Sequence, residues 1–148
     1  MLGLIQLVSQ ANVKIDHQIV ATIDRGIMAL IGIEKSDTEQ YAEKLLEKII
    51  NYRIFPDSDG KMNLSLKQIE GALLLVPQFT LVAETDKGTR PGFSRGMPPE
   101  EGARLFHYLL KHARSNYSNP ISAGEFGAHM EVSLCNDGPV TFLLKTKT

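Results

Sequence analysis

The stretch that most restricts the fold is a continuous apolar run, Ile27-Met28-Ala29-Leu30-Ile31-Gly32-Ile33, which follows Gly26. The run is short for a helix, and a glycine bounds it. This combination predicts a β-strand that is buried on both faces. The run is therefore expected to be a central element of the core.

Several shorter segments predict further strands of the same sheet. Near the start of the chain these are Leu4–Val8, Asn12–Ile15 and Ile19–Ile23, with a turn at Asp16-His17 that predicts a hairpin meander. The apolar segment Ala72–Val76 predicts another strand. Near the end, two strands are predicted in His129–Cys135 and Val140–Leu144, on either side of an Asn-Asp-Gly-Pro turn.

Two segments predict amphipathic helices. Apolar residues recur at helical spacing over residues 38–52, where Asp37 is expected to cap the helix with Gln40 as its capping partner. A second helix is expected after Met97, with Pro98-Pro99 in its first turn and an end near Ser115-Asn116. Together the elements predict an α+β fold in which a curved or barrel-like sheet carries two main helices packed outside it. The expected organisation is a single domain over residues 1–148.

Composition narrows the function classes. The formal net charge of −1 argues against a protein that grips nucleic acid through bulk charge, so no DNA partner is expected and any RNA contact must be local. No apolar stretch approaches the ~18 residues of a membrane helix, and a membrane location is not expected. Cys135 is the only cysteine, which fits a reducing compartment and predicts a cytoplasmic location. We expect its thiol to be buried and inert.

The chain lacks the usual signatures of metal and cofactor sites. None of the four histidines stands at ligand spacing, and Asp57-Ser58-Asp59-Gly60 reads as a turn because the remaining ligands of a calcium loop are missing. No nucleophile elbow, dinucleotide fingerprint or Walker lysine is present. We therefore expect neither a metal nor a cofactor.

Two short segments place polar atoms beside unusual backbone. Gln78-Phe79-Thr80-Leu81 closes the strand at Ala72–Val76 and offers an amide, a hydroxyl and free backbone N–H groups at a strand end, where chemistry is often found. In Asn136-Asp137-Gly138-Pro139-Val140-Thr141 a turn runs directly into proline, and X-Pro bonds are cis in about 5–6% of folded cases. A rigid edge without side chains there would test the handedness of a bound amino acid. An ordinary hairpin turn is the alternative.

The chain resembles the D-aminoacyl-tRNA deacylase (D-tyrosyl-tRNA deacylase) family. The resemblance is nearly full-length and is carried by Leu4-Ile5-Gln6, Tyr52-Arg53-Ile54-Phe55, Gly60–Ser65, Gln78–Leu81, Arg90-Pro91 with Phe93, and Asn136–Thr141. It implies hydrolysis of the ester of D-aminoacyl-tRNA, often also of glycyl-tRNA, as a proofreading step of translation that spares L-aminoacyl-tRNA. It implies a homodimer in which Gly138-Pro139 is a cis pair that reaches into the partner's pocket and binds substrate. It also implies that Gln78, Phe79 and Thr80 line the site where the ester is cut.

Two residues near this site depart from the family pattern. Pro77 stands where serine commonly precedes the glutamine, and proline offers neither a hydroxyl nor a backbone donor. Leu7 stands where relatives often carry arginine. These substitutions keep open a noncatalytic dimer that binds an RNA end or an amino acid. A third reading is a general esterase that uses Thr80.

The chemistry at Thr80 is also open at this stage. A hydroxyl nucleophile needs a base, and the sequence places no His, Asp or Glu beside Thr80. An aminoacyl-tRNA ester carries a neighbouring ribose hydroxyl, which would allow substrate-assisted hydrolysis, with the backbone N–H groups of Phe79 and Thr80 stabilising the oxyanion.

Local basic residues offer contacts to the phosphates of a tRNA 3′ end. They are Lys87, Arg90 and Arg95 in the loop Thr85–Gly96, and Arg104, Lys111 and Arg114 on the second helix. Solvated surface charge is the alternative reading. The loop itself is rich in Gly, Thr and charge, and we expect it to be a mobile lid.

Overall fold

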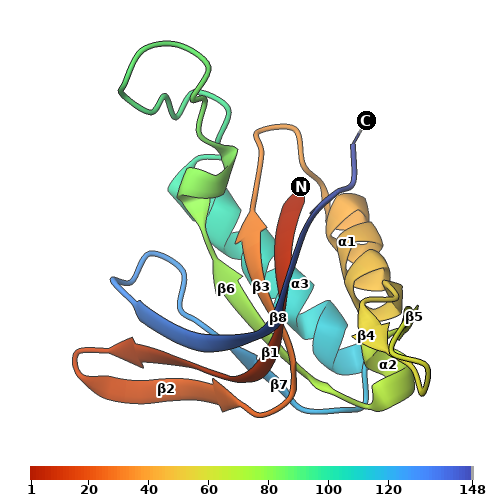
Figure 1. The fold of residues 1–148 in the computed structure, drawn as a ribbon. Helices are drawn as coiled ribbons and strands as arrows, with labels where there is room; N and C mark the ends of the chain where they lie inside the picture. Colours follow the sequence, from red (N-terminus) through yellow and green to blue (C-terminus); the bar gives the residue numbers. More distant parts are fainter. Residues whose placement is uncertain (148) are drawn as a thin grey trace.

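One long strand organises the sheet. In the computed structural model, which describes residues 1–147, β1 (Leu2–Ile15) pairs antiparallel with β2 (Gln18–Ile23), β3 (Gly26–Gly32) and β8 (Glu131–Lys145). The sheet then continues in parallel through β6 (Ala72–Pro77) and β7 (Ile121–Ala123). The strands curve strongly, so that β2 and the adjoining parts of β1 and β8 extend away from the two long helices, toward the lower left of the view (Figure 1). The expected α+β fold with a barrel-like sheet is confirmed.

Two predicted strand boundaries were wrong. The segments Leu4–Val8 and Asn12–Ile15 both belong to β1. The segments His129–Cys135 and Val140–Leu144 both belong to β8, except that residues 129 and 130 precede the strand. In both cases an irregularity in the pairing between β1 and β8 absorbs the apparent break: register shifts occur between Gln6 and Val8 and between Val8 and Gln10. A β-bulge bends a strand without ending it, which is why turn residues here do not end either strand.

β3 confirms the prediction made from the apolar run. Its residues alternate between two buried clusters: Ile27, Ala29 and Ile31 face the helices, while Met28 faces the space enclosed by the curled part of the sheet. Both faces of the strand are therefore covered, so polar side chains would be costly on either side.

Two long helices, α1 (Glu39–Asn51) and α3 (Pro99–Asn116), pack side by side against the same face of the sheet (Figure 1). Each buries an apolar stripe, including Leu45 and Ile49 in α1 and Leu105 and Leu109 in α3. The remaining elements are short: β4 (Phe55–Pro56), β5 (Met62–Leu64), α2 (Leu66–Ile69) and the 3₁₀ helix η1 (Phe79–Val82). The predicted helices are confirmed, with Pro99 in the first turn of α3.

Asp37 does not cap α1 as expected. The N-cap position is Thr38, whose side chain makes no capping bond. The Asp37 carboxylate instead accepts from three donors: the Met1 amino group at 2.7 Å, the Glu34 N–H at 2.7 Å and Lys147 Nζ at 2.8 Å. A buried carboxylate needs such partners, and here they come from both ends of the described chain.

The prediction of a buried thiol at Cys135 was also wrong. Cys135 is exposed, because its side chain lies on the same solvent-facing side of β8 as those of Glu131 and Ser133.

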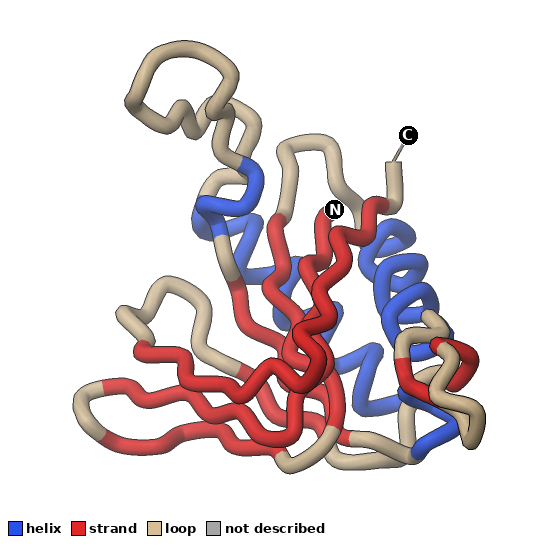
Figure 2. The backbone as a smooth tube through the Cα atoms, in the orientation of Figure 1, coloured by secondary structure: helices blue, strands red, loops and turns tan. Residues whose placement is uncertain are grey.

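Asp57–Gly60 forms the predicted turn, with the Asp57 carboxylate accepting the backbone N–H groups of Asp59 and Lys61. The Thr85–Gly96 loop stands out from the rest of the molecule as the tan segment beyond η1 (Figure 2). Its base is held by paired backbone bonds between Glu84 and Gly92, at 2.7 and 2.9 Å. Mobility of this loop stays a prediction.

Candidate active site

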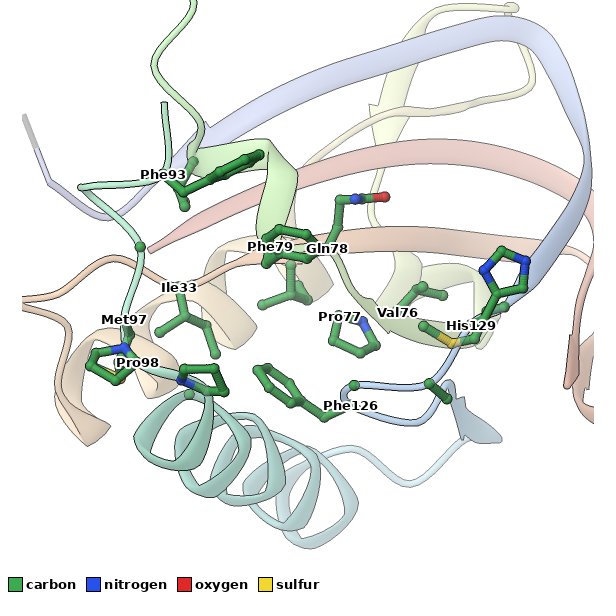
Figure 3. Close-up of a pocket in the computed structure, with 18 of the residues that line it drawn as sticks. Ile33, Val76, Pro77, Gln78, Phe79, Phe93, Met97, Pro98, Phe126 and His129 are labelled. Carbon is green, nitrogen blue, oxygen red and sulfur yellow. The ribbon is translucent and has the colours of Figure 1, made fainter. Parts of the chain in front are cut away.

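A mostly apolar cavity of about 630 Å³ opens at the carboxyl ends of the parallel strands β3 and β6. Val76 and Pro77 form its floor at the end of β6, and Ile31 and Ile33 come from the end of β3 and the residue beyond it. Figure 3 shows Phe79 and Phe93 on one side of the cavity and Pro98 and Phe126 on the other, next to α3. The volume and lining suit a small, largely apolar group such as an amino acid side chain or a base.

Gln78 and Phe79 enter the site because β6 ends there. The Gln78 N–H donates to the Ile31 carbonyl at 2.8 Å, which continues the pairing of β3 and β6 by one residue before the chain turns into η1. The Phe79 ring is 65% exposed and contacts the ring of Phe93, with centroids 5.5 Å apart. Large exposed aromatic rings at a cavity mouth are typical of ligand contacts, since apolar surface is normally buried.

Thr80 is exposed beside the cavity. Its hydroxyl oxygen accepts a hydrogen bond from the Gln78 side-chain amide. Among residues 1–147, no carboxylate or imidazole hydrogen-bonds this hydroxyl, and the amide N–H groups of Phe79 and Thr80 donate to no protein acceptor. The segment beside the cavity thus has two backbone donors without a protein acceptor and a Gln78 amide held by Thr80, but no base for a threonine nucleophile.

Gly138 and Pro139 lie on a bulge of β8. Gln6 of β1 pairs with Thr141 of β8, and Val8 pairs with Asn136. One residue separates the pair on β1 and four separate the pair on β8, so the bulge holds three extra residues. Both Gly138 and Pro139 are exposed, the bond between them is cis, and Gly138 has φ +151°. The cis bond implied by the resemblance is confirmed. Gln78 and Phe79 line the cavity of their own chain, whereas Thr80, Gly138 and Pro139 do not.

Several lining residues were not anticipated from the sequence. Phe126 and His129 come from the segment between β7 and β8, and His129 is the one titratable side chain in the lining. The available signal was an aromatic residue between Gly124 and Gly127, since a large ring in a glycine-rich loop has little local core to join.

The two departures from the family pattern fall in different environments. Leu7 is 3% exposed and belongs to the helix-side core, where an apolar side chain is well placed. Pro77 ends β6 and lines the cavity, and its ring contributes apolar surface there. The part of the chain that the structure describes contains no helix that meets the length and hydropathy of a membrane span, and no cluster of three or more potential metal-ligating acids, histidines or cysteines.

Comparison with known proteins agrees with the geometry. The sequence model of the family described as D-Tyr-tRNA(Tyr) deacylase matches residues 4–145. A D-aminoacyl-tRNA deacylase of Pseudomonas syringae pv. tomato is 54% identical over 147 residues, covering 99% of this chain and all of the relative. A D-aminoacyl-tRNA deacylase of Nitrosococcus oceani is 52% identical over 145 residues, covering 98% of this chain and 93% of the relative.

Two solved structures share the fold. One, described as c-Myc DNA Unwinding Element Binding Protein, has a TM-score of 0.95 at 35% identity and full coverage of both chains. The other, described as a probable eukaryotic D-amino acid tRNA deacylase, has a TM-score of 0.82 at 18% identity over 97% of each chain. The curled mixed sheet is thus shared with both solved structures. The chain belongs to the D-Tyr-tRNA(Tyr) deacylase family.

Proposed function

We propose that this protein hydrolyses the ester of D-aminoacyl-tRNA, and of glycyl-tRNA, to free amino acid and tRNA, while sparing L-aminoacyl-tRNA. The observation that carries the proposal is the placement of Gln78 and Phe79 in the lining of the cavity beyond β6, in a chain 54% identical to a D-aminoacyl-tRNA deacylase over its whole length. The exposed Phe79 and Phe93 rings suit stacking on an unpaired base at the 3′ end of tRNA.

We infer that the protein orients the ester and that the substrate supplies the activating hydroxyl. The Phe79 and Thr80 N–H groups donate to the carbonyl oxygen as negative charge develops on it. The Thr80 hydroxyl accepts from Gln78 and so keeps that amide in place. A neighbouring ribose hydroxyl of the substrate assists the attack of water, because no protein base is paired with Thr80 in the described chain.

The proposed assembly is a homodimer in which Gly138-Pro139 of each subunit completes the partner's site. Three observations support it: both residues are exposed, they lie outside their own chain's cavity, and β8 nearby carries an exposed apolar side chain at Phe142. Rejecting one hand of an amino acid by ~10⁴-fold needs ~5.5 kcal/mol, which rigid backbone at the alpha carbon supplies by steric exclusion. The proposed compartment is the cytoplasm, since a chain with one exposed cysteine suits reducing conditions.

The test is deacylation of D-Tyr-tRNA, L-Tyr-tRNA and Gly-tRNA by the purified protein at equal concentrations, against a no-enzyme control. Rapid loss of the D-tyrosyl and glycyl esters with the L-tyrosyl ester spared is the expected result. Binding of charged tRNA without ester loss would instead identify a noncatalytic RNA-end binder. Cleavage of simple esters without tRNA would identify a general esterase.

A further inference from the structure

A second cavity, of about 460 Å³, adjoins the proposed active site. The two cavities share Val82, and the consecutive residues Arg95 and Gly96 line one cavity each. A strand of nucleic acid whose terminal nucleoside occupied the first cavity would therefore be within reach of the second over a short length of chain.

The second cavity is basic. Its charged lining residues are three cations, Arg95, Lys145 and Lys147, and one carboxylate, Glu34. The rest of the lining is apolar: Leu2, Leu81, Val82 and Leu143. Glu34 is itself 3.4 Å from the Met1 amino group, and Lys147 pairs with Asp37. Arg95 and Lys145 make no ion pair within residues 1–147, and both are exposed.

The backbone beneath these cations is fixed. The Arg95 carbonyl accepts the Lys35 N–H at 3.0 Å, and two residues later the Met97 N–H donates to the Ile33 carbonyl at 3.1 Å. Lys145 is the last residue of β8 and pairs with Leu2. The Arg95 and Lys145 side chains thus extend from anchored backbone, so binding an anion has to order these two side chains but not the backbone that carries them.

A further positive charge lies close by. Lys48 of α1 donates from Nζ to the Lys145 carbonyl at 3.2 Å, which places its ammonium group against the end of β8. The positive charge is thus concentrated beside the cavity, although the whole chain carries a formal net charge of −1. A chain without an overall positive charge can bind RNA only where its cations are gathered locally, as they are beside this cavity.

We propose that Arg95 and Lys145, supported by Lys48, bind backbone phosphates of the tRNA strand that leads to the 3′ end. This inference rests on the proposed function, because it takes the first cavity as the site of the terminal aminoacyl nucleoside. Arg95 presents a planar fork of donors that matches a phosphate, and Lys145 adds a point charge. These contacts bind the phosphodiester chain and are independent of the amino acid and its handedness.

The experiment measures the Kd of an uncharged acceptor-stem RNA hairpin ending in CCA, by fluorescence anisotropy, for the wild type and the double variant Arg95→Gln/Lys145→Gln. The matched control is Lys67→Gln, an exposed lysine on α2 at the opposite end of the molecule (Figure 1). Uncharged RNA makes the readout independent of hydrolysis. In parallel, kcat and KM are measured with D-Tyr-tRNA and with D-tyrosyl-adenosine, which has no phosphate.

The double variant is expected to raise the Kd for the hairpin and the KM for D-Tyr-tRNA about tenfold and to leave kcat unchanged. The slope of log Kd against log salt should fall by about 1.4, from two phosphate contacts at about 0.7 each for a single strand. D-tyrosyl-adenosine hydrolysis and the Tm should match the wild type, and Lys67→Gln should change nothing.

Unchanged RNA affinity and salt dependence in the double variant would overturn the proposal. An equal fall in kcat/KM for D-Tyr-tRNA and for D-tyrosyl-adenosine would overturn it too. Unchanged RNA affinity with weakened binding of a poly-glutamate peptide would instead assign the cavity to an acidic protein partner. Failure of the wild type to cleave either ester would reject the proposed function alone, because the hairpin affinity still decides whether these residues bind phosphates.

Discussion

The side chain of Asn136 spans the bulge that carries Gly138 and Pro139. Its Oδ1 accepts the Val140 N–H at 2.8 Å, and its Nδ2 donates to Thr141 Oγ1 at 3.0 Å. Gln6 of β1 donates to the same Thr141 hydroxyl at 3.3 Å, which connects the bulge to the neighbouring strand. The exposed Gly138-Pro139 edge is therefore held at both ends by side-chain hydrogen bonds.

Asn136→Ala should loosen this edge and reduce the discrimination between D- and L-substrates. We expect the ratio of kcat/KM for D-Tyr-tRNA and L-Tyr-tRNA to fall at least tenfold, mainly through faster cleavage of the L-ester. The two lost hydrogen bonds should also lower the free energy of unfolding by about 1–3 kcal/mol. The matched control is Asn51→Ala on α1, whose amide bonds only to Glu47 and lies outside the proposed site. An unchanged D/L ratio would show that this bond network does not set selectivity.

Pro139→Ala tests the rigid edge directly. Removing the ring frees φ and adds a backbone N–H, so an L-substrate would meet a backbone that can move aside. We expect measurable hydrolysis of L-Tyr-tRNA, with the rate for Gly-tRNA within about threefold of the wild type because glycine has no side chain to reject. Retained selectivity with full activity would remove Pro139 from the proposed filter.

Thr80→Ala should retain turnover. The Thr80 hydroxyl accepts from Gln78 and has no paired base, so its loss removes one orienting bond and leaves the two backbone donors in place. A single hydrogen bond of this kind contributes about 0.5–1.5 kcal/mol, which corresponds to at most about a tenfold fall in kcat. Single-turnover deacylation of D-Tyr-tRNA measures this rate. Loss of activity by 10⁴-fold would make Thr80 the nucleophile.

The sequence predicted the elements of the fold better than the way they join. Helical periodicity located α1 and α3, and a continuous apolar run located β3, because each of these signals lies within a single segment. It divided β1 and β8 at polar or turn residues, because a bulge between paired strands depends on the partner strand and leaves no periodic signal. Asp37 was misread as a cap for the same reason: two of its three donors, Met1 and Lys147, lie far from it in sequence.

The candidate site likewise contains residues that could be predicted from a single segment and residues that only folding brings together. Gln78, Phe79 and Thr80 follow directly on a predictable strand, so their place at its end could be anticipated. Phe93 and Phe126 reach the cavity from separate loops on different sides, and only the folded chain brings them together. Arg95 was predicted to contact phosphates, but its place in one cavity with Lys145 could not be foreseen, since the two residues are fifty positions apart in sequence.

Asp57 should make stability depend on acid pH. A hydrogen bond from the Asn63 side chain, at 2.8 Å, and backbone bonds from Lys61 and Asp59 hold the pKa of the Asp57 carboxyl below its usual 3.8. A carboxyl whose pKa is lower in the folded state contributes stability above the unfolded pKa and loses it as pH falls through the folded one.

The difference in unfolding free energy between the wild type and Asp57→Asn should therefore be constant above pH 5 and shrink progressively below the usual pKa of 3.8. Urea unfolding at matched protein concentration from pH 6 to pH 2.5 measures it. Asp59→Asn is the control, because its side chain makes no hydrogen bond in the described structure. A difference independent of pH would show that the charge of Asp57 is not what its donors stabilise.

Asp37→Ala should lower the free energy of unfolding more than the other substitutions described above, because it removes the carboxylate that joins the two ends of the described chain. The Asp37 side chain is fully buried, and the Met1 amino group beside it is buried too. Removing one member of a buried ion pair costs about 3–5 kcal/mol, because the remaining charge loses its main partner where little water reaches it. Here the Met1 amino group keeps only the Glu34 carboxylate at 3.4 Å and the Thr146 hydroxyl at 3.0 Å, so we expect a loss at the lower end of that range. Glu39→Ala is the matched control, as the Glu39–Arg104 pair is 3.2 Å long but more than half exposed on both sides, and such pairs contribute about 0–1 kcal/mol. Urea unfolding followed by circular dichroism, at one protein concentration, should separate the two variants by at least about 2 kcal/mol. Equal stabilities would mean that the Asp37 cluster contributes no more than an exposed pair.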